Sequence, residues 1–262
     1  MKLSVTSLNS GSNGNCYYIG NENEAVLIDA GISCREIEKR MKRLELSLSK
    51  LKAIFISHEH SDHIKGVDVF SKKYKIPVYI TPGTLQNARL NLHNPFLCKL
   101  SSKESITIGT LEITAFPKFH DAFDPQSFVV KCGNLCIGVF TDIGVPCEQV
   151  IQNFKCCNAI FLESNYDEDM LLQGNYPYYL KSRISSNKGH LSNIQALDLF
   201  LNYKSESLTH LFLSHISKEN NEPNLIKELF NPHAQNVNII LTSRTEEIPV
   251  YEIEGELKSL AS

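Results

Sequence analysis

The sequence predicts an α/β fold in which two sheets pack face to face and helices cover their outer sides. Apolar strand-like runs and amphipathic helix-like runs alternate along the 262 residues in two blocks, each with strands and flanking helices. The composition, 42% hydrophobic and 21% charged, is ordinary for a globular protein. Because a chain of this length can bury a substantial core, we expect a single domain over residues 1–262.

Each block predicts a definite series of elements. The first predicts strands near 2–8, 16–20 and 24–29, a helix near 33–46, a strand at 51–57, and helices near 63–75 and 82–92. The second predicts strands near 105–118 and 127–141, a helix near 145–154, a strand at 158–163, helices near 167–173, 177–186 and 192–203, and strands near 208–214 and 236–242 with a helix between them. We expect the last residues, 255–262, to fray.

The run HEHSDH, from His58 to His63, places three imidazoles and a carboxylate within six residues. It follows the buried strand-like run LKAIFIS and precedes an amphipathic stretch, so it forms a strand–loop–helix junction. His58 and His60 alternate by two and can point to one side of an extended segment. Asp62 and His63 begin the helix and can face the same space. This spacing is typical of a metal-binding site; a polar turn rich in histidine is the alternative.

Three more residues that can bind metal each follow an apolar, strand-like run. His120 follows LEITAFPKF, Asp142 follows LCIGVFT, and His215 follows LTHLFLS. Agreement among such separated segments is harder to obtain by chance than any one of them. For each residue taken alone, a hydrogen-bonded polar group at a strand end is the alternative.

Together, HEHSDH, FHDA, FTDIG and LSHIS resemble the metallo-β-lactamase superfamily over nearly the whole chain. The stretches SLNSGSNGN, LIDAGIS, ESNYDEDML, NYPYYLKSRI and GHLSN are similar to its YycJ/WalJ (VicX) branch, whose members are regarded as nuclease-like metallo-hydrolases. The resemblance implies a four-layer αββα sandwich with two metal ions at one edge.

The resemblance also implies how two divalent metal ions are held. The first ion would be held by His58, His60 and His120, and the second by Asp62, His63 and His215. Asp142 would bridge the two ions. Imidazole and carboxylate ligands suit zinc or manganese, and magnesium or iron are possible as well. Two metals about 3.5–4 Å apart can share a bridging hydroxide and clamp the oxygens of an in-line displacement at phosphorus. We therefore expect a dinuclear phosphodiester hydrolase, a nuclease that acts on DNA or RNA.

The segment GHLSN, residues 189–193, adds further candidate residues. Nucleases of the resembled superfamily place a histidine opposite the metals, and the unperturbed pKa of histidine suits proton transfer near neutrality, so we expect His190 to be catalytic. Asp62 is expected to be catalytic as well as a ligand. Ser192 and Asn193 precede a helix, where they are expected to contact a substrate phosphate. The alternative is that they cap the helix.

Four other residues complete the expected site. Asn15 lies in the loop SGSNGN, whose glycines let backbone amides approach an anion, although a plain hairpin loop is the alternative. Lys181 and Arg183 belong to the helical segment 164–190, which we expect near the edge of the active site. Cations and tyrosines there are expected to bind a nucleic-acid strand, with a solvated helix face as the alternative. Asp29 follows the strand AVLI and is expected to hydrogen-bond a ligand imidazole.

The net charge and the apolar runs of the sequence indicate where the protein is located and which partners it binds. The net charge of −3 gives no overall basic surface for nucleic acid. No apolar run reaches the roughly 20 residues that span a bilayer, and the N-terminus lacks the apolar core of a secretion signal. We therefore expect a cytoplasmic protein with no membrane partner and with free thiols at its eight cysteines. The sequence predicts no particular oligomeric state.

Two other functions stay open. A small-molecule hydrolase, such as a thioester hydrolase of glyoxalase II type, shares the HxHxDH motif and the bridging aspartate. The GHLSN segment and the basic, tyrosine-rich stretch favour a nucleic acid instead. The second alternative is a metal-stabilised regulatory protein without turnover, against which the apparently complete ligand set argues.

Overall fold

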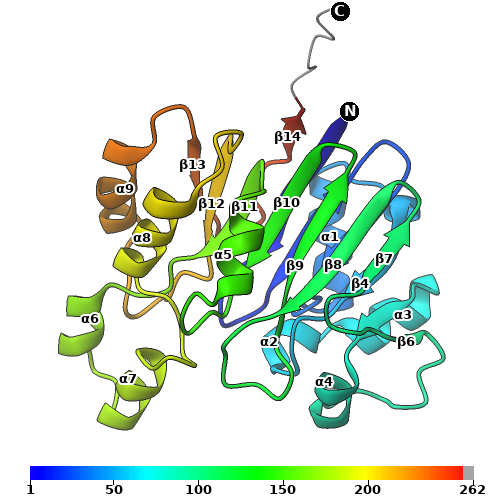
Figure 1. The fold of residues 1–262 in the computed structure, drawn as a ribbon. Coiled ribbons are helices and arrows are strands. Elements are labelled where there is room, and N and C mark those ends of the chain that lie inside the picture. Colours follow the sequence, from blue (N-terminus) through cyan, green and yellow to red (C-terminus); the bar gives the residue numbers. More distant parts are fainter. Residues whose placement is uncertain (256–262) are drawn as a thin grey trace, which may run out of the picture.

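A computed structural model describes residues 1–255 of the chain, and within that range the strands form two seven-stranded sheets (Figure 1). The expectation that the last residues fray falls, apart from residue 255, outside the described residues. The strands and helices alternate in the order that the apolar runs predict.

The first sheet has the strand order β14-β1-β2-β3-β4-β5-β6. Its strands are β1 (Lys2–Asn9), β2 (Cys16–Gly20), β3 (Ala25–Ile28), β4 (Leu51–Phe55), β5 (Val78–Ile80), β6 (Leu97–Lys99) and β14 (Tyr251–Glu254). Strands β3 to β6 are parallel, whereas β14, β1, β2 and β3 pair antiparallel. The helical segments of this half are α1 (Cys34–Arg43), the 3₁₀ turn Leu48–Lys50, α2 (Ser61–Ile64), α3 (Val67–Tyr74) and α4 (Pro82–Asn87).

The second sheet has the strand order β13-β12-β11-β10-β9-β8-β7. Its strands are β7 (Ser105–Ile108), β8 (Leu111–Pro117), β9 (Gln126–Cys132), β10 (Leu135–Phe140), β11 (Ala159–Glu163), β12 (His210–Ser214) and β13 (Asn238–Leu241). Strands β7 to β10 pair antiparallel, and β10 to β13 are parallel. The helical segments here are α5 (Glu148–Phe154), α6 (Glu168–Gln173), α7 (Tyr178–Ile184), α8 (Asn193–Tyr203), α9 (Pro223–Phe230) and the 3₁₀ turn Asn231–His233.

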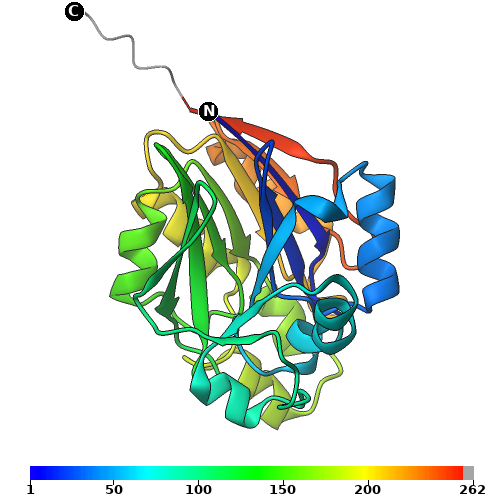
Figure 2. The same cartoon turned by 90° about the vertical axis from the view of Figure 1, so that its right-hand side faces the viewer.

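Buried apolar side chains hold the four layers together. One cluster fills the space between the sheets, where the rings of Phe161 and Phe212 stack with centroids 4.5 Å apart. A second cluster packs α5, α8 and α9 onto the second sheet, and a third packs α1 and α3 onto the first. In Figure 2 the blue helix α1 and the green helix α5 lie on opposite outer sides of the sheets. The predicted αββα sandwich is therefore confirmed.

The structure differs from the predicted elements at a few short segments. The expected helix 63–75 is divided into α2 and α3 at Gly66, whose backbone lies so close to the segment after β3 that a Cβ there would be 2.1 Å from the carbonyl oxygen of Ile32. The expected helix 82–92 ends at Asn87. Strands β5, β6 and β14 were not predicted, because runs of three or four residues are too short to show a period.

Two composition-based expectations can be compared with the structure. All eight cysteines lie within the described residues and are free, as predicted. Among residues 1–255, no helix combines the length and the apolar character needed to cross a membrane.

Candidate metal centre

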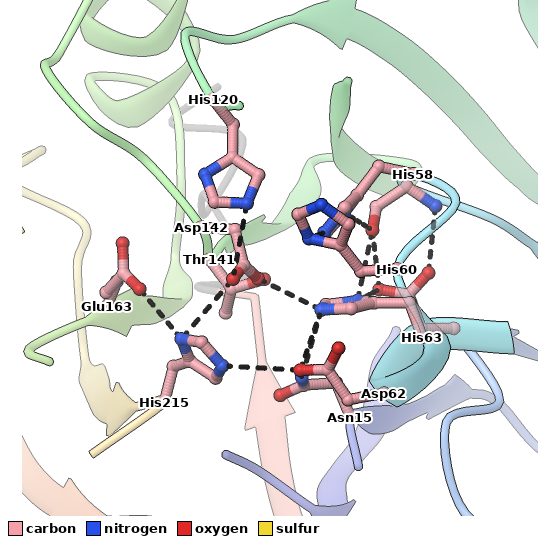
Figure 3. Close-up of polar contacts among 12 residues, drawn as sticks. Asn15, His58, His60, Asp62, His63, His120, Thr141, Asp142, Glu163 and His215 are labelled. Atoms are coloured by element: carbon pink, nitrogen blue, oxygen red, sulfur yellow. Dashed lines mark hydrogen bonds and ion pairs between the residues drawn. The ribbon is translucent and has the colours of Figure 1, made fainter. Parts of the chain in front are cut away.

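Polar residues that follow the strands meet at one edge of the two sheets. Strands β8 and β10 run in the same direction, and β3 and β4 are parallel to each other, so their carboxyl ends can share an edge. The residues that come shortly after β3, β4, β8, β10 and β12 are Asp29, His58, His120, Asp142 and His215. Figure 3 shows the seven predicted metal ligands pointing toward one another there.

The first predicted ligand set is compact. His58 Nε2 lies 3.0 Å from His60 Nδ1. The ring of His120 has its centroid 4.9 Å from that of His58 and 5.2 Å from that of His60. One nitrogen from each of the three imidazoles lies within 4.8 Å of the others, which is a geometry that can hold a metal ion.

The second predicted set lies beside the first. Asp62 Oδ2 is 3.7 Å from His63 Nε2 and 3.9 Å from His215 Nε2. Asp142 lies between the two sets, because its Oδ2 is 3.3 Å from His63 Nε2 and its Oδ1 is 4.0 Å from His120 Nε2. Burial raises the pKa of Asp142, but His215 and His63 outweigh burial and hold this pKa well below its ordinary value. The carboxylate is therefore ionised, as a metal ligand must be.

The hydrogen bonding of this cluster is incomplete. Among the described residues, His120 Nε2, Asp142 Oδ2 and His215 Nε2 are buried without a hydrogen-bond partner. Buried polar atoms are seldom left unsatisfied, so each such atom needs an explanation. Imidazole nitrogen and carboxylate oxygen are ligands of divalent metal ions, and an ion at this point would satisfy all three atoms. The residues present therefore fit a divalent metal site.

The backbone is strained where three of these residues leave their strands. Asp29, Asp142 and His215 have φ values of +62°, +54° and +54°. This left-handed region is sparsely populated by residues other than glycine, and such conformations cluster at functional sites. The sharp turn directs each side chain back into the centre.

Asp29 and Ser57 hold His63 from behind. Asp29 Oδ2 lies 2.7 Å from His63 Nδ1, and the backbone N–H and the hydroxyl of Ser57 each donate to the Asp29 carboxylate over 2.8 Å. Burial lowers the pKa of His63, but Asp29 and the other carboxylates outweigh burial and raise it. A carboxylate on the far nitrogen fixes the tautomer of a metal-binding histidine. The position of Asp29 suits its predicted role, and the part of Ser57 was not predicted.

Glu163 is a functional candidate that the sequence reasoning missed. It ends β11, is fully buried, and places Oε1 2.8 Å from both His190 Nδ1 and His215 Nδ1. Burial raises the pKa of Glu163, but His190 and His215 outweigh burial and lower the pKa to about 2. The signal was available, because the run AIFLE ends in a carboxylate just as the strand before Asp142 does.

His190 lies over the cluster. Its ring centroid is 5.2 Å from that of His120 and 5.2 Å from that of His215, and its Nδ1 is 3.7 Å from Asp142 Oδ1. Its side chain is 15% exposed, whereas the side chains of His120 and His215 are almost completely buried. The structure thus brings His190 to the centre, on the side that solvent reaches.

Asn15 lies beneath the ligands. Its amide nitrogen is 3.0 Å from His63 Nε2 and 3.4 Å from Asp62 Oδ2, and the residue is fully buried. Its amide oxygen accepts from the backbone N–H of Gly11 and from the hydroxyl of Tyr17. Asn15, one of the residues expected at the site, thus lies where it can orient the ligands.

The side chains of Ser192 and Asn193, for which we predict phosphate contacts, are engaged in hydrogen bonds within the protein. Ser192 caps α8 by accepting from Gln195 N–H, and its hydroxyl donates to Glu168. The amide of Asn193 exchanges two hydrogen bonds with Asn221. Both residues are buried, so their polar atoms are committed within the protein. The structure supports the capping alternative for Ser192.

Lys181 and Arg183 lie on the exposed helix α7, at the lower left of Figure 1. Lys181 Nζ donates to the carbonyl oxygen of Leu172, away from the centre. Arg183 pairs with Asp121 Oδ2 at 2.5 Å, and Asp121 Oδ1 is 3.2 Å from His120 Nε2. Arg183 is therefore next to the centre, and Lys181 is not directed at it.

Known proteins resemble the chain over most of its length. The profile of the Metallo-beta-lactamase superfamily matches residues 10–125. The chain is 34% identical over 230 residues to "Exodeoxyribonuclease YycJ" of Bacillus anthracis, and the aligned region covers 87% of each protein. It is 32% identical over 230 residues to "Exodeoxyribonuclease WalJ" of Streptococcus pneumoniae, and the aligned region covers 85% of this chain and 83% of that protein.

The fold is also similar to that of solved structures. The crystal structure of the metallo-beta-lactamase fold protein YhfI from Bacillus subtilis superposes with a TM-score of 0.72 at 16% identity and covers 96% of this chain and 100% of that one. The chain therefore belongs to the metallo-β-lactamase superfamily, in the family of the YycJ and WalJ proteins.

Proposed function

We propose that this protein is a metal-dependent nuclease that hydrolyses phosphodiester bonds of DNA. The observation that carries the proposal is the convergence of seven imidazole and carboxylate side chains on one point, where three buried atoms have no hydrogen-bond partner among the described residues. The names of the relatives YycJ and WalJ, both exodeoxyribonucleases, favour DNA and cleavage from an end.

The proposal assigns two divalent ions, zinc or manganese, to this centre. His58, His60 and His120 would hold one ion, and Asp62, His63 and His215 would hold the other, with Asp142 shared. When bound, such ions activate water and offset the negative charge that develops at phosphorus. Asp29, Ser57 and Glu163 keep the imidazoles oriented.

His190 and Asp62 are assigned the proton transfers. Glu163 Oε1 accepts from His190 Nδ1, which orients the imidazole and leaves Nε2 to donate a proton to the leaving oxygen. Asp62 has a side chain that is 20% exposed, in contrast to the buried Asp142. In this proposal Asp62 accepts a proton from the attacking water.

Exposed aromatic rings near the centre support a nucleic-acid substrate. Phe119 and Phe123 flank the loop of His120 and are 51% and 70% exposed. Tyr178 and Tyr179 on α7 are 85% and 73% exposed. Aromatic rings stack on unpaired bases without regard to sequence, so a single strand is the form that they would bind. A cytoplasmic location, where such a substrate is present, belongs to the same proposal.

A substrate panel tests the proposal. The metal-loaded protein is incubated with labelled DNA, labelled RNA, bis(4-nitrophenyl) phosphate and an acyl-glutathione thioester. We expect hydrolysis of DNA and of the aryl phosphodiester, and loss of both activities in Asp142→Ala and His60→Ala variants that remain folded. Turnover of the thioester alone would favour the glyoxalase II-type alternative, which the relatives do not favour. A full metal content without any hydrolysis would favour a regulatory protein.

A further inference from the structure

A cavity of about 450 Å³ lies beside His60, between α2 and the segment that follows α4. In Figure 1 the helices α2 and α4 are neighbours at the lower edge of the molecule. His60 belongs both to the cavity wall and to the metal centre, so the cavity and the centre are adjacent. The volume falls within the range of about 300–1,000 Å³ typical of small-ligand pockets, which is room for one nucleotide.

Two exposed cations that form no ion pair among residues 1–255 belong to the cavity wall. Lys65 and Arg89 line it, and both side chains are exposed. Neither forms an ion pair among residues 1–255, which is true of most lysines and arginines there. Arg183, on the other side of the centre, is paired with Asp121. Unpaired cations next to a metal ligand are suited to bind phosphate oxygens.

Glu59 and Asp68 also line the cavity, and their hydrogen bonds go to neutral groups rather than to Lys65 or Arg89. Asp68 accepts from the backbone N–H of Asn91 and from the side chain of Asn94, so its carboxylate is committed to the loop after α4. Glu59 Oε1 accepts from the backbone N–H of Phe123. Glu59 Oε2 is buried and has no partner among the described residues. It is therefore available to a donor on a ligand, such as an amino or imino group of a base.

Phe123 lies next to a residue of the cavity wall. Its backbone is tied to Glu59, a residue of the cavity wall, and its ring is 70% exposed. Cations for a phosphate, an unsatisfied acceptor and an exposed ring for a base thus occur together beside the metal centre. We infer that this cavity binds one nucleotide of the strand, the one whose phosphate contacts Lys65 and Arg89 next to the bond that is cut.

This inference rests on the proposed nuclease function, and kinetics with two substrates test it. Lys65→Gln and Arg89→Gln are compared with the wild type on a single-stranded oligodeoxynucleotide and on bis(4-nitrophenyl) phosphate, which contains no nucleotide. We expect each variant to raise the KM for the oligodeoxynucleotide by about five- to tenfold, with the aryl phosphate changed by less than about twofold. Lys65→Arg and Arg89→Lys should restore most of the affinity. The matched control is Lys42→Gln, on the exposed face of α1.

Binding without turnover gives a second readout. Thymidine 5′-monophosphate, thymidine and inorganic phosphate are titrated into the metal-free wild type and the Arg89→Gln variant by calorimetry. The inference expects the monophosphate to bind more tightly than either fragment and to bind Arg89→Gln at least about fivefold more weakly. Phosphate binding as tightly as the nucleotide would overturn it in favour of a simple anion site.

The two proposals can fail separately. An unchanged oligodeoxynucleotide KM in both Gln variants, with an active wild type, overturns the cavity and leaves the nuclease function standing. A wild type that hydrolyses neither substrate overturns the nuclease function, and the titration then decides the cavity. Equal binding of the monophosphate to wild type and Arg89→Gln would overturn the cavity in that case.

Discussion

At the scale of single residues, the side chains behind the metal ligands determine what substitutions do. Glu163 is the clearest example, because one carboxylate oxygen lies 2.8 Å from the Nδ1 atoms of two histidines. Its other oxygen accepts from the backbone N–H groups of Ile143 and Leu191. Glu163 therefore links His190 and His215 to the loop that carries Asp142.

Glu163→Gln is expected to weaken both metal binding and turnover. The substitution keeps the shape but removes the charge that orients two imidazoles, and changes of this kind typically cost about 10–100-fold in metal affinity or activity. Metal titration and kcat on bis(4-nitrophenyl) phosphate measure the effect. The control is Glu148→Gln, on the exposed surface of α5. Unchanged metal affinity and kcat would show that Glu163 only fills space.

His190→Ala is expected to separate catalysis from metal binding. If His190 protonates the leaving oxygen, its removal should lower kcat by about 10²–10⁴-fold while the metal content stays that of the wild type. Metal analysis of the purified variant, alongside kcat, measures both quantities. Loss of one ion from this variant would instead make His190 a metal ligand.

The sequence predicted these residues unequally. The seven ligand candidates could be predicted because each lies in HEHSDH or just after an apolar run. Glu163 follows the same rule and was overlooked. The roles of Ser192 and Asn193 are harder to predict, because a polar side chain at the start of a helix looks the same whether it caps the helix or binds an anion. Only the contacts with Glu168 and Asn221 distinguish the two roles.

At the scale of elements, helix α8 shows what a cap contributes. The Ser192 hydroxyl accepts from Gln195 N–H, and the Gln195 side chain accepts from Ser192 N–H, which completes a capping box. Ser192→Ala should therefore lower the free energy of unfolding by about 1 kcal/mol. It should leave the KM for an oligodeoxynucleotide unchanged.

Denaturant unfolding and steady-state kinetics of Ser192→Ala measure these two quantities. Ser102→Ala, at an exposed turn, is the control for the loss of a serine hydroxyl. A raised KM together with unchanged stability would restore the predicted phosphate contact of Ser192.

The long elements could be predicted and the short ones could not. Runs such as LKAIFIS and LCIGVF show a clear apolar pattern, and β4 and β10 form there. Strands β6 and β14 are the edge of a sheet, have only three and four residues, and are stabilised by their neighbours rather than by their own sequence. The break at Gly66 depends on a contact with Ile32 that no local pattern reveals.

At the scale of the whole molecule, the centre joins the two sheets. His58 and His60 come from the loop after β4 of the first sheet, and Asp62 and His63 come from the helix α2 that follows it. The other three ligands follow strands of the second sheet. That these loops meet is a property of the tertiary fold. Local spacing alone could not predict it, and it entered the sequence analysis only through the resemblance to a family.

Metal binding should therefore stabilise the entire molecule. A ligand that binds only the folded state, at about 100 times its Kd, contributes about 2.7 kcal/mol, which corresponds to a rise in Tm of roughly 5–10 °C for a protein of this size. Thermal unfolding with a chelator and after addition of zinc or manganese measures the rise. The Asp142→Ala variant should show a much smaller rise. Equal Tm values for the metal-free and metal-loaded wild type would contradict a site that joins both sheets.

The central claim is that seven side chains hold two divalent ions at one point, and anomalous diffraction from crystals grown with zinc or manganese tests it most directly. The account predicts two peaks about 3.5–4 Å apart. One peak should contact His58, His60 and His120, the other Asp62, His63 and His215, and Asp142 should contact both. Peaks at any other place, or no peak among these residues in metal-saturated crystals, would contradict the account.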